Sequence, residues 1–212
     1  GNMRITIVGC GNMGTAYARS FRKYGLVKSD DLLLVVRSDS GHEQLERLGR
    51  VTRTVDGAIT SSDLVIVAVK PQDFGALSTG LADVLRADQV VLSIMAGITL
   101  ERLSVALRHR TVVRAMPNAP AQIGMGITAY TTATELSMRQ TLMVEQLLNS
   151  TGRAVHLSNE TLLDPVTALS GSGPAYIFHL VRTMIRTGTD LGLEPHVASA
   201  LVKQTLLGSY HL

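Results

Sequence analysis

A series of short apolar runs, separated by segments with helical spacing, constrains the fold of this chain most strongly. Five runs show it: "RITIVG", "DLLLVV", "DLVIVAV", "QVVLSI" and "RTVVRAM". They are rich in Val, Ile and Leu and hardly alternate with polar residues, as is typical of strands covered on both faces. Alternating strand and helix indicates right-handed βαβ units and a parallel sheet. We therefore predict an α/β fold with a Rossmann-type doubly wound sheet.

The strand pattern stops near residue 158, after two further predicted strands, "GITAY" and "RAVHL". Two helices are predicted beyond it, from Pro174 to about Leu191 and from Pro195 to about Tyr210. Gly192 lies where a glycine commonly ends a helix, and proline suits a first helical turn. The prediction is a Rossmann domain over residues 1–160 and a small all-helical domain over residues 161–212.

The helix from Pro174 has only a narrow polar stripe, and the rest of its surface is apolar. A helix that is apolar over most of its circumference must be covered on several sides. One further helix and the sheet do not easily supply that cover. We expect a partner chain, in a symmetric dimer.

The segment "IVGCGNMG" places Gly9, Gly11 and Gly14 in G-x-G-x-x-G spacing. The motif follows a predicted strand and opens a predicted helix, the context that distinguishes a dinucleotide loop from a plain tight turn. We predict that the loop, including Cys10, Asn12 and Met13, binds the pyrophosphate of a dinucleotide at the helix N-terminus.

The second strand ends in "VVRSDS", where NAD-binding chains usually carry an acidic residue. Arg37 and Ser38 stand there instead, and a guanidinium can bind a 2′-phosphate through two hydrogen bonds. This favours NADP, as NADPH, with NAD possible because Asp39 is also near enough to accept a ribose hydroxyl. The alternative is that Arg37 is a solvated surface residue.

The next three strands also end in candidate contacts, because ligands of open α/β sheets lie beyond the carboxyl ends of the strands. Asn118, in "AMPNAP", offers an amide to a carboxamide or a substrate; the alternative is an ordinary loop residue. The other candidates at these ends are predicted cofactor contacts: Ala68, Val69, Lys70, Pro71, Ala96 and Gly97.

Composition excludes several other classes of function. The formal charge is only +3 and aromatic residues make up 4% of the chain, which argues against a nucleic-acid partner. No apolar run is long enough to span a membrane. No His/Cys spacing resembles a metal site. The single cysteine and the lack of a signal-peptide pattern lead us to expect a cytoplasmic protein.

Three segments, "AVKPQ", "AMPNAPAQIGMG" and "DPVTALSGSGPAY", together resemble the pyrroline-5-carboxylate reductase family. "TDLGLEP" and "KQTLLGSYHL" extend the resemblance over nearly the whole chain. It implies reduction of 1-pyrroline-5-carboxylate to L-proline by hydride transfer from NAD(P)H, the last step of proline biosynthesis. It also implies a helical dimerisation domain, and a homodimer or a ring of dimers.

The resemblance places Glu160 and Thr167 at the substrate end of the site. Each has a simpler alternative: Glu160 as a solvated residue, and Thr167 as a helical threonine bonded to its own backbone. Ser172 lies in "SGSGPAY", which we expect to cap the next helix and to pass close to the nicotinamide. Alternatively, that loop serves only capping and packing. No catalytic residue is predicted, because the imine nitrogen can take its proton from water.

The family continues past "QTLLG" with further helices and a glycine-rich loop that holds the substrate carboxylate. This sequence ends at Leu212. The expectation is therefore either an incomplete sequence or a non-catalytic or substrate-altered NADP-binding relative of the same fold.

Overall fold

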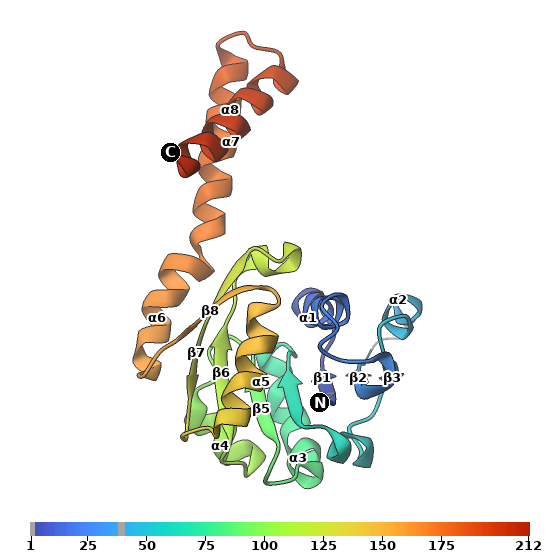
Figure 1. The fold of residues 1–212 in the computed structure, drawn as a ribbon. Coiled ribbons are helices and arrows are strands. Elements are labelled where there is room, and N and C mark those ends of the chain that lie inside the picture. Colours follow the sequence, from blue (N-terminus) through green and yellow to red (C-terminus); the bar gives the residue numbers. More distant parts are fainter. Residues whose placement is uncertain (1–2, 38–40) are drawn as a thin grey trace.

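The computed structural model describes residues 3–37 and 41–212, within which eight strands form one sheet in the order β3-β2-β1-β4-β5-β6-β7-β8 (Figure 1). The strands are β1 (Ile5–Val8), β2 (Leu32–Val35), β3 (Arg50–Thr52), β4 (Leu64–Val67), β5 (Val90–Ser93), β6 (Val112–Met116), β7 (Gly126–Thr132) and β8 (Gly152–His156). The order reverses at β1, between β2 and β4, which is where a doubly wound sheet opens its ligand crevice. The predicted Rossmann-type sheet is confirmed.

The parallel sheet predicted from the five apolar runs is confirmed, and one pair beyond those runs is antiparallel. β1 to β6 are mutually parallel, but β7 is antiparallel to β6, and β8 is again parallel to β7. The connection between β6 and β7 spans only residues 117–125, which is shorter than the dozen or so residues of a crossover. The chain therefore turns back on itself after β6.

Strand β3 was not predicted. It is three residues long, "RVT", at the sheet edge, and none of its residues is buried. A strand this short and this polar carries no apolar run for a sequence pattern to reveal.

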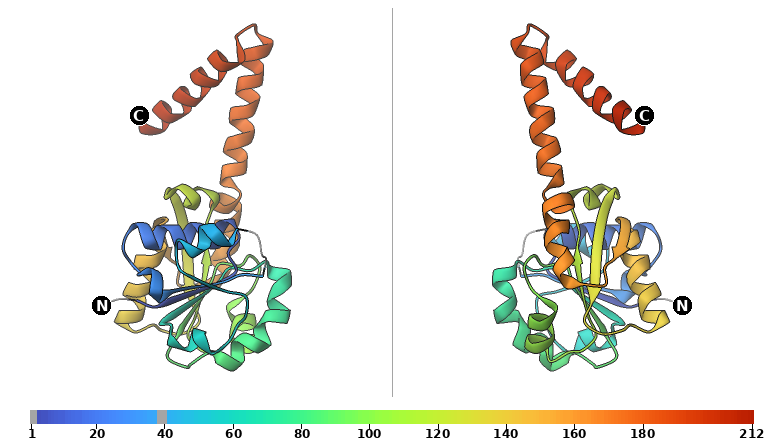
Figure 2. Two further views of the ribbon diagram at one scale, coloured as in Figure 1. Left: turned by 90° about the vertical axis from the view of Figure 1, so that its right-hand side faces the viewer. Right: turned by 90° about the vertical axis from the view of Figure 1, so that its left-hand side faces the viewer.

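Helices cover both faces of the sheet (Figures 1 and 2). One face packs against α1 (Asn12–Lys23), α2 (His42–Glu46) and α5 (Met138–Asn149), whose buried side chains share a cluster with Ile5 and Ile7 of β1. The other face packs against α3 (Phe74–Val84) and α4 (Leu100–Leu107), which bury Val65 and Val67 of β4. Alternate residues of one strand thus enter opposite cores, which explains why the strands read as continuous apolar runs.

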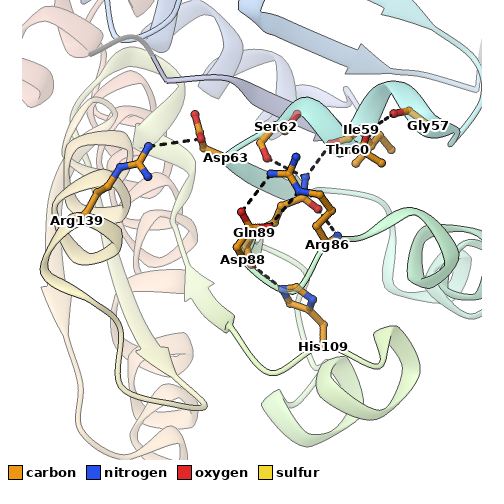
Figure 3. Close-up of polar contacts among 10 residues, drawn as sticks. All are labelled: Gly57, Ile59, Thr60, Ser62, Asp63, Arg86, Asp88, Gln89, His109 and Arg139. Atoms are coloured by element: carbon orange, nitrogen blue, oxygen red, sulfur yellow. Dashed lines mark hydrogen bonds and ion pairs between the residues drawn. The ribbon is translucent and has the colours of Figure 1, made fainter.

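The amino ends of β4 and β5 are held by a buried polar network (Figure 3). The Gln89 amide nitrogen donates to the carbonyls of Ile59 and Ser62, each at 2.8 Å, and the Gln89 carbonyl lies 2.6 Å from His109 Nε2. The Gln89 side-chain oxygen accepts the Arg86 N–H at 2.7 Å. Both Gln89 and His109 are buried. This end of the sheet is therefore closed by hydrogen bonds, opposite the ends where ligands of such folds bind.

A helical arm projects from the sheet (Figures 1 and 2). The short helix α6 (Leu163–Val166) still packs on the sheet, where Leu163 is buried with Met116 and Ala129. Beyond it α7 (Gly173–Asp190) extends away, and α8 (Pro195–His211) turns back at an angle to α7, so that the two helices diverge from their connection (Figure 2). Gly192 has a φ of 102°, so the predicted glycine stop between the two helices is confirmed. The predicted boundary at residue 160 stays a prediction.

The arm leaves its apolar side chains uncovered. None of the α7 residues is buried, and only Ala198 is buried on α8. The exposed large apolar side chains of the two helices include Tyr176, Ile177, Phe178, Leu180, Met184, Leu201, Leu207 and Tyr210. Among residues 3–37 and 41–212, no helix combines the length and apolarity that a bilayer span requires.

Replacing Gln89 by alanine tests the network at the amino ends of the strands. The change leaves the Ile59 and Ser62 carbonyls buried without their donor, so we expect Gln89→Ala to lower the free energy of unfolding by about 2–4 kcal/mol. Urea unfolding measures it. The matched control is Gln44→Ala on the exposed face of α2, expected within about 0.5 kcal/mol of the parent. Equal losses in the two variants would contradict the assignment.

Candidate active site

A pocket of about 730 Å³ opens at the carboxyl ends of β1, β2 and β4. Seven of the residues predicted to bind cofactor line it: Gly9, Cys10, Gly11, Arg37, Ala68, Val69 and Lys70. The remaining lining residues are Val8, Val35, Val36, Leu45, Arg53, Val55, Gln72, Asp73, Ala76 and Leu77. The structure thus brings the first loop and the ends of the second and fourth strands into one cavity.

The glycines of the first loop are required by backbone geometry. Gly9 has a φ of 94°, and a Cβ there would lie 2.8 Å from the Ala68 carbonyl carbon. A Cβ on Gly14 would overlap the Gly9 carbonyl oxygen, so the start of α1 rests directly on the turn after β1. At Gly11 a Cβ would meet nothing within 4 Å, which leaves that side of the loop open to a ligand. These are the three roles that the motif predicts.

The first turn of α1 faces this opening with positive character. Asn12, Met13 and Gly14 form the turn, whose N–H groups have no acceptor within the helix. No acidic side chain lies in that turn, and Lys70 adds a cation to the pocket wall. The helix dipole and the lysine both favour an anionic group at this position.

Arg37 extends from the end of β2 at the pocket rim. Its Nη1 lies 3.2 Å from Asp73 Oδ1, and 78% of its side chain is exposed. An ion pair this exposed is weak and can exchange for a ligand phosphate. Ser38, the other predicted contact, lies outside the described residues, as does Asp39.

Sequence reasoning missed the far wall of the pocket. Leu45, Val55, Ala76 and Leu77 are apolar lining residues that come from α2, from the segment after β3, and from α3. Arg53 directly follows β3, so the rule that ligands lie beyond strand ends would have found it had β3 been predicted. An apolar wall beside the Arg37 rim suits a flat heteroaromatic ring.

Two of the other predicted cofactor positions lie one strand further along the sheet. Ala96 and Gly97 form the turn after β5, in which Gly97 has a φ of 74°. Pro71 begins a short 3₁₀ turn just after β4. These residues extend the line of strand ends from the pocket toward β6 and Asn118.

Asn118, just past β6, ties two backbone segments together. Its Oδ1 accepts the Ile127 N–H at 2.9 Å, and its Nδ2 donates to the Ser170 carbonyl at 3.2 Å. The side chain therefore connects the sheet domain to the segment that leads into α7.

The expected capping loop before α7 is helical instead. Residues Thr167–Gly171 form a π-helical turn that continues α6, and Ser172 makes no side-chain cap for α7. The wide turn is closed by the Ser172 N–H donating to the Thr167 carbonyl at 2.8 Å. The predicted position of the cap is confirmed, since Ser172 is the N-cap residue of α7 and Pro174 lies in its first turn. The expected side-chain cap is absent, because the chain runs into α7 as helix. Single π turns often mark functional sites.

The hydroxyl of Thr167 donates to the Leu163 carbonyl at 2.9 Å, which is the local bond anticipated as its alternative role. Glu160 is also engaged within the protein. Its Oε2 accepts Arg114 Nη1 at 3.0 Å and the Leu100 N–H at 2.7 Å.

Cys10 lies at the pocket wall as a neutral side chain. Burial raises the pKa of its thiol to about 12, so the thiolate that metal binding or redox chemistry needs is not formed near neutral pH. In the part of the chain that the structure describes, no group of three or more His, Cys, Asp or Glu side chains is placed to hold a metal ion.

Family models match both parts of the chain. Residues 4–97 match a model described as NADP oxidoreductase, coenzyme F420-dependent, which covers the glycine loop and the first strands. Residues 160–212 match a model described as pyrroline-5-carboxylate reductase dimerisation, which covers α6, the π turn and the arm.

Solved structures share the fold over nearly the whole chain. A pyrroline-5-carboxylate reductase from Coxiella burnetii superposes with a TM-score of 0.92 at 27% identity, covering 100% of this chain and 79% of that one. The Plasmodium falciparum pyrroline carboxylate reductase with NADP bound gives a TM-score of 0.88 at 25% identity, covering 99% and 78%.

Curated relatives are more similar in sequence. The chain is 36% identical to the pyrroline-5-carboxylate reductase of Pseudomonas aeruginosa over 212 residues, which covers 97% of this chain and 76% of that protein. It is 34% identical to the enzyme of Mycobacterium tuberculosis, covering 99% and 73%. These matches include the loop of Gly9, Gly11 and Gly14, called the glycine cradle below, together with the strand ends and the helical arm. The chain belongs to the pyrroline-5-carboxylate reductase family.

Proposed function

We propose that this protein reduces 1-pyrroline-5-carboxylate to L-proline with NADPH, the last step of proline biosynthesis. The observation that carries the proposal is a match at 36% identity to a protein named pyrroline-5-carboxylate reductase over 97% of this chain. That match includes the glycine cradle and every strand end that lines the candidate site. NADP is bound in the Plasmodium falciparum relative, and NAD is a possible second cofactor here.

The cradle fits a dinucleotide. Its pyrophosphate would lie over Gly11 at the start of α1, where the backbone is open and the N–H groups point outward. Arg37 would exchange its exposed partner Asp73 for the 2′-phosphate, a charge-assisted bond worth roughly 1.5–3 kcal/mol. The adenine would lie against Leu45 and Val55. The cofactor would supply the hydride.

The nicotinamide end then falls toward the ends of β5 and β6. We place Ala96 and Gly97 beside the ring, with Asn118, Thr167 and Ser172 toward the substrate. Glu160 lies at the same end of the site, where it is bound by Arg114 and the Leu100 N–H. A cyclic imine that carries its own proton accepts hydride directly, so the protein's task is to hold donor and acceptor about 3–3.5 Å apart. We assign no residue as proton donor.

The helical arm is the part of the chain that we propose to bind a partner. The uncovered apolar side chains of α7 and α8 suit a second copy of the chain, as the matched dimerisation model implies. We propose a homodimer, or a ring of dimers, in the cytoplasm. Neither nucleic acid nor membrane is a partner in this proposal.

Mixing the purified protein with NADPH and pyrroline-5-carboxylate tests the activity. We expect NADPH absorbance to fall and L-proline to accumulate in equal amount, which amino-acid analysis checks. NADPH binding without turnover, measured by calorimetry in parallel, would instead favour a non-catalytic or substrate-altered relative.

Replacing Arg37 by aspartate tests the cofactor preference. Loss of the 2′-phosphate contact is expected to reduce the NADPH/NADH ratio of kcat/KM by about 10–150-fold, since each 1.4 kcal/mol is worth about tenfold. The control is Arg19→Asp, an equal charge change on the exposed face of α1. If the ratio is the same in both variants, Arg37 does not contact the phosphate.

Two glycine substitutions separate packing from binding. Gly14→Ala overlaps the Gly9 carbonyl oxygen, so we expect a loss of about 1–3 kcal/mol of stability as well as weaker NADPH binding. Gly11→Ala meets no protein atom within 4 Å, so stability should hold while NADPH affinity falls by about tenfold or more. Thermal unfolding and calorimetry measure the two effects. An unchanged affinity in Gly11→Ala would place the pyrophosphate elsewhere.

A further inference from the structure

Arg114 is a buried cation within the sheet. It lies on β6, its side chain is 8% exposed, and it shares a sheet face with Val112 and Met116, which pack under α4 and α6 respectively. Its Nη1 bonds Glu160 Oε2 at 3.0 Å, whereas its Nε has no hydrogen-bond partner among the described residues. A cation buried this deeply depends on its partner, because removing that partner leaves the charge uncompensated.

Glu160 has a second contact that reaches a different part of the fold. The same Oε2 accepts the N–H of Leu100 at 2.7 Å. Leu100 is the first residue of α4, so the carboxylate lies at the positive end of that helix, where negative charge is favoured. One carboxylate oxygen thus joins β6, the start of α4 and the beginning of the segment that leads to the arm.

The turn held in this way is the one next to the proposed nicotinamide position. Ala96 and Gly97 lie only four and three residues before Leu100, respectively, between the end of β5 and the start of α4. Their placement depends on where α4 begins. Glu160 holds that point, although it lies outside the unit formed by β5, α4 and β6. Asn118 makes a second link from the end of β6 to the same outside segment, through the Ser170 carbonyl.

We propose that Glu160 is a positioning residue. Paired with Arg114, it holds the Ala96–Gly97 turn in a fixed position relative to the segment that leads into the helical arm. The position of the arm on the sheet is thereby coupled to the geometry of the site around the proposed nicotinamide position. The inference rests on the proposed function for its catalytic consequence. It differs from a direct substrate contact, because the carboxylate acts through the backbone of α4.

Glu160→Ala removes both bonds and is the first test. We expect faster hydrogen exchange at the Leu100 amide and across residues 94–100, and an NADPH dissociation constant raised by about tenfold. The kcat with pyrroline-5-carboxylate should fall by on the order of 10²-fold, the cost of misplacing reacting groups by about 1 Å. The fold and the oligomeric state, checked by circular dichroism and sedimentation, should be kept.

A double variant provides the rescue. In Arg114→Met with Glu160→Gln, the buried charge is gone and the glutamine side-chain oxygen can still accept the Leu100 N–H. We expect this variant to recover kcat and the slow Leu100 exchange to within about threefold of the parent, whereas Glu160→Gln alone should not, since it leaves Arg114 buried without a counter-charge.

The matched control is Glu145→Ala. Glu145 accepts the Tyr130 hydroxyl at 2.8 Å on the opposite face of the sheet, so this change removes a part-buried hydrogen bond without touching the turn. Similar losses of kcat in Glu145→Ala and Glu160→Ala would overturn the proposal, as would unchanged exchange at residues 94–100. A rise confined to the KM for pyrroline-5-carboxylate would assign Glu160 to direct substrate contact instead. Absence of turnover in the parent protein would contradict the proposed function alone. Hydrogen exchange and NADPH affinity would still test the positioning role of Glu160.

Discussion

The close contact between the start of α1 and the turn after β1 governs the candidate site. Because Gly14 has no side chain, the first helical turn rests on the Gly9 carbonyl, and the helix axis points into the crevice between β2 and β4. The rest of α1 is then held by burial, with Tyr17 and Phe21 fully enclosed beside Ile5 and Ile7. The N-terminal dipole, the open backbone at Gly11 and the pocket all follow from this contact.

Strand β6 has a comparable role at the other end of the site. It is the last strand of the parallel set β1 to β6, and the chain returns from it as antiparallel β7 because residues 117–125 are too few for a crossover. Its polar residues reach outward: Arg114 to Glu160, and Asn118, just beyond it, to Ser170. Both partners lie in the segment from residue 160 onward, so β6 anchors that segment to the sheet through polar contacts, beside the apolar contact of Leu163 with Met116.

The arm has the opposite character. None of the α7 residues is buried, and its exposed apolar side chains continue onto α8. A surface of this kind is stable in water only when something covers it. The two helices contact each other closely near their connection, where a Cβ on Gly188 would lie 3.2 Å from the Ala198 Cβ. Further along, the arm offers its apolar face to a partner, which agrees with the dimerisation model that matches residues 160–212.

The sequence by itself determined the sheet and the glycine loop at the start of α1. Both depend on local patterns: apolar runs long enough to mark strands covered on both faces, and three glycines at fixed spacing. Arg37 and Lys70 also lie where the strand-end rule put them. Tertiary structure alone decided what depends on residues distant in the chain. The antiparallel β7, the polar edge strand β3 and its Arg53, and the π turn in place of a capping loop carry no local signal of their own. The same holds for Glu160, whose bonds reach 60 residues back to Leu100 and 46 back to Arg114, a pairing that exists only once α4 and α6 pack on one face of the sheet.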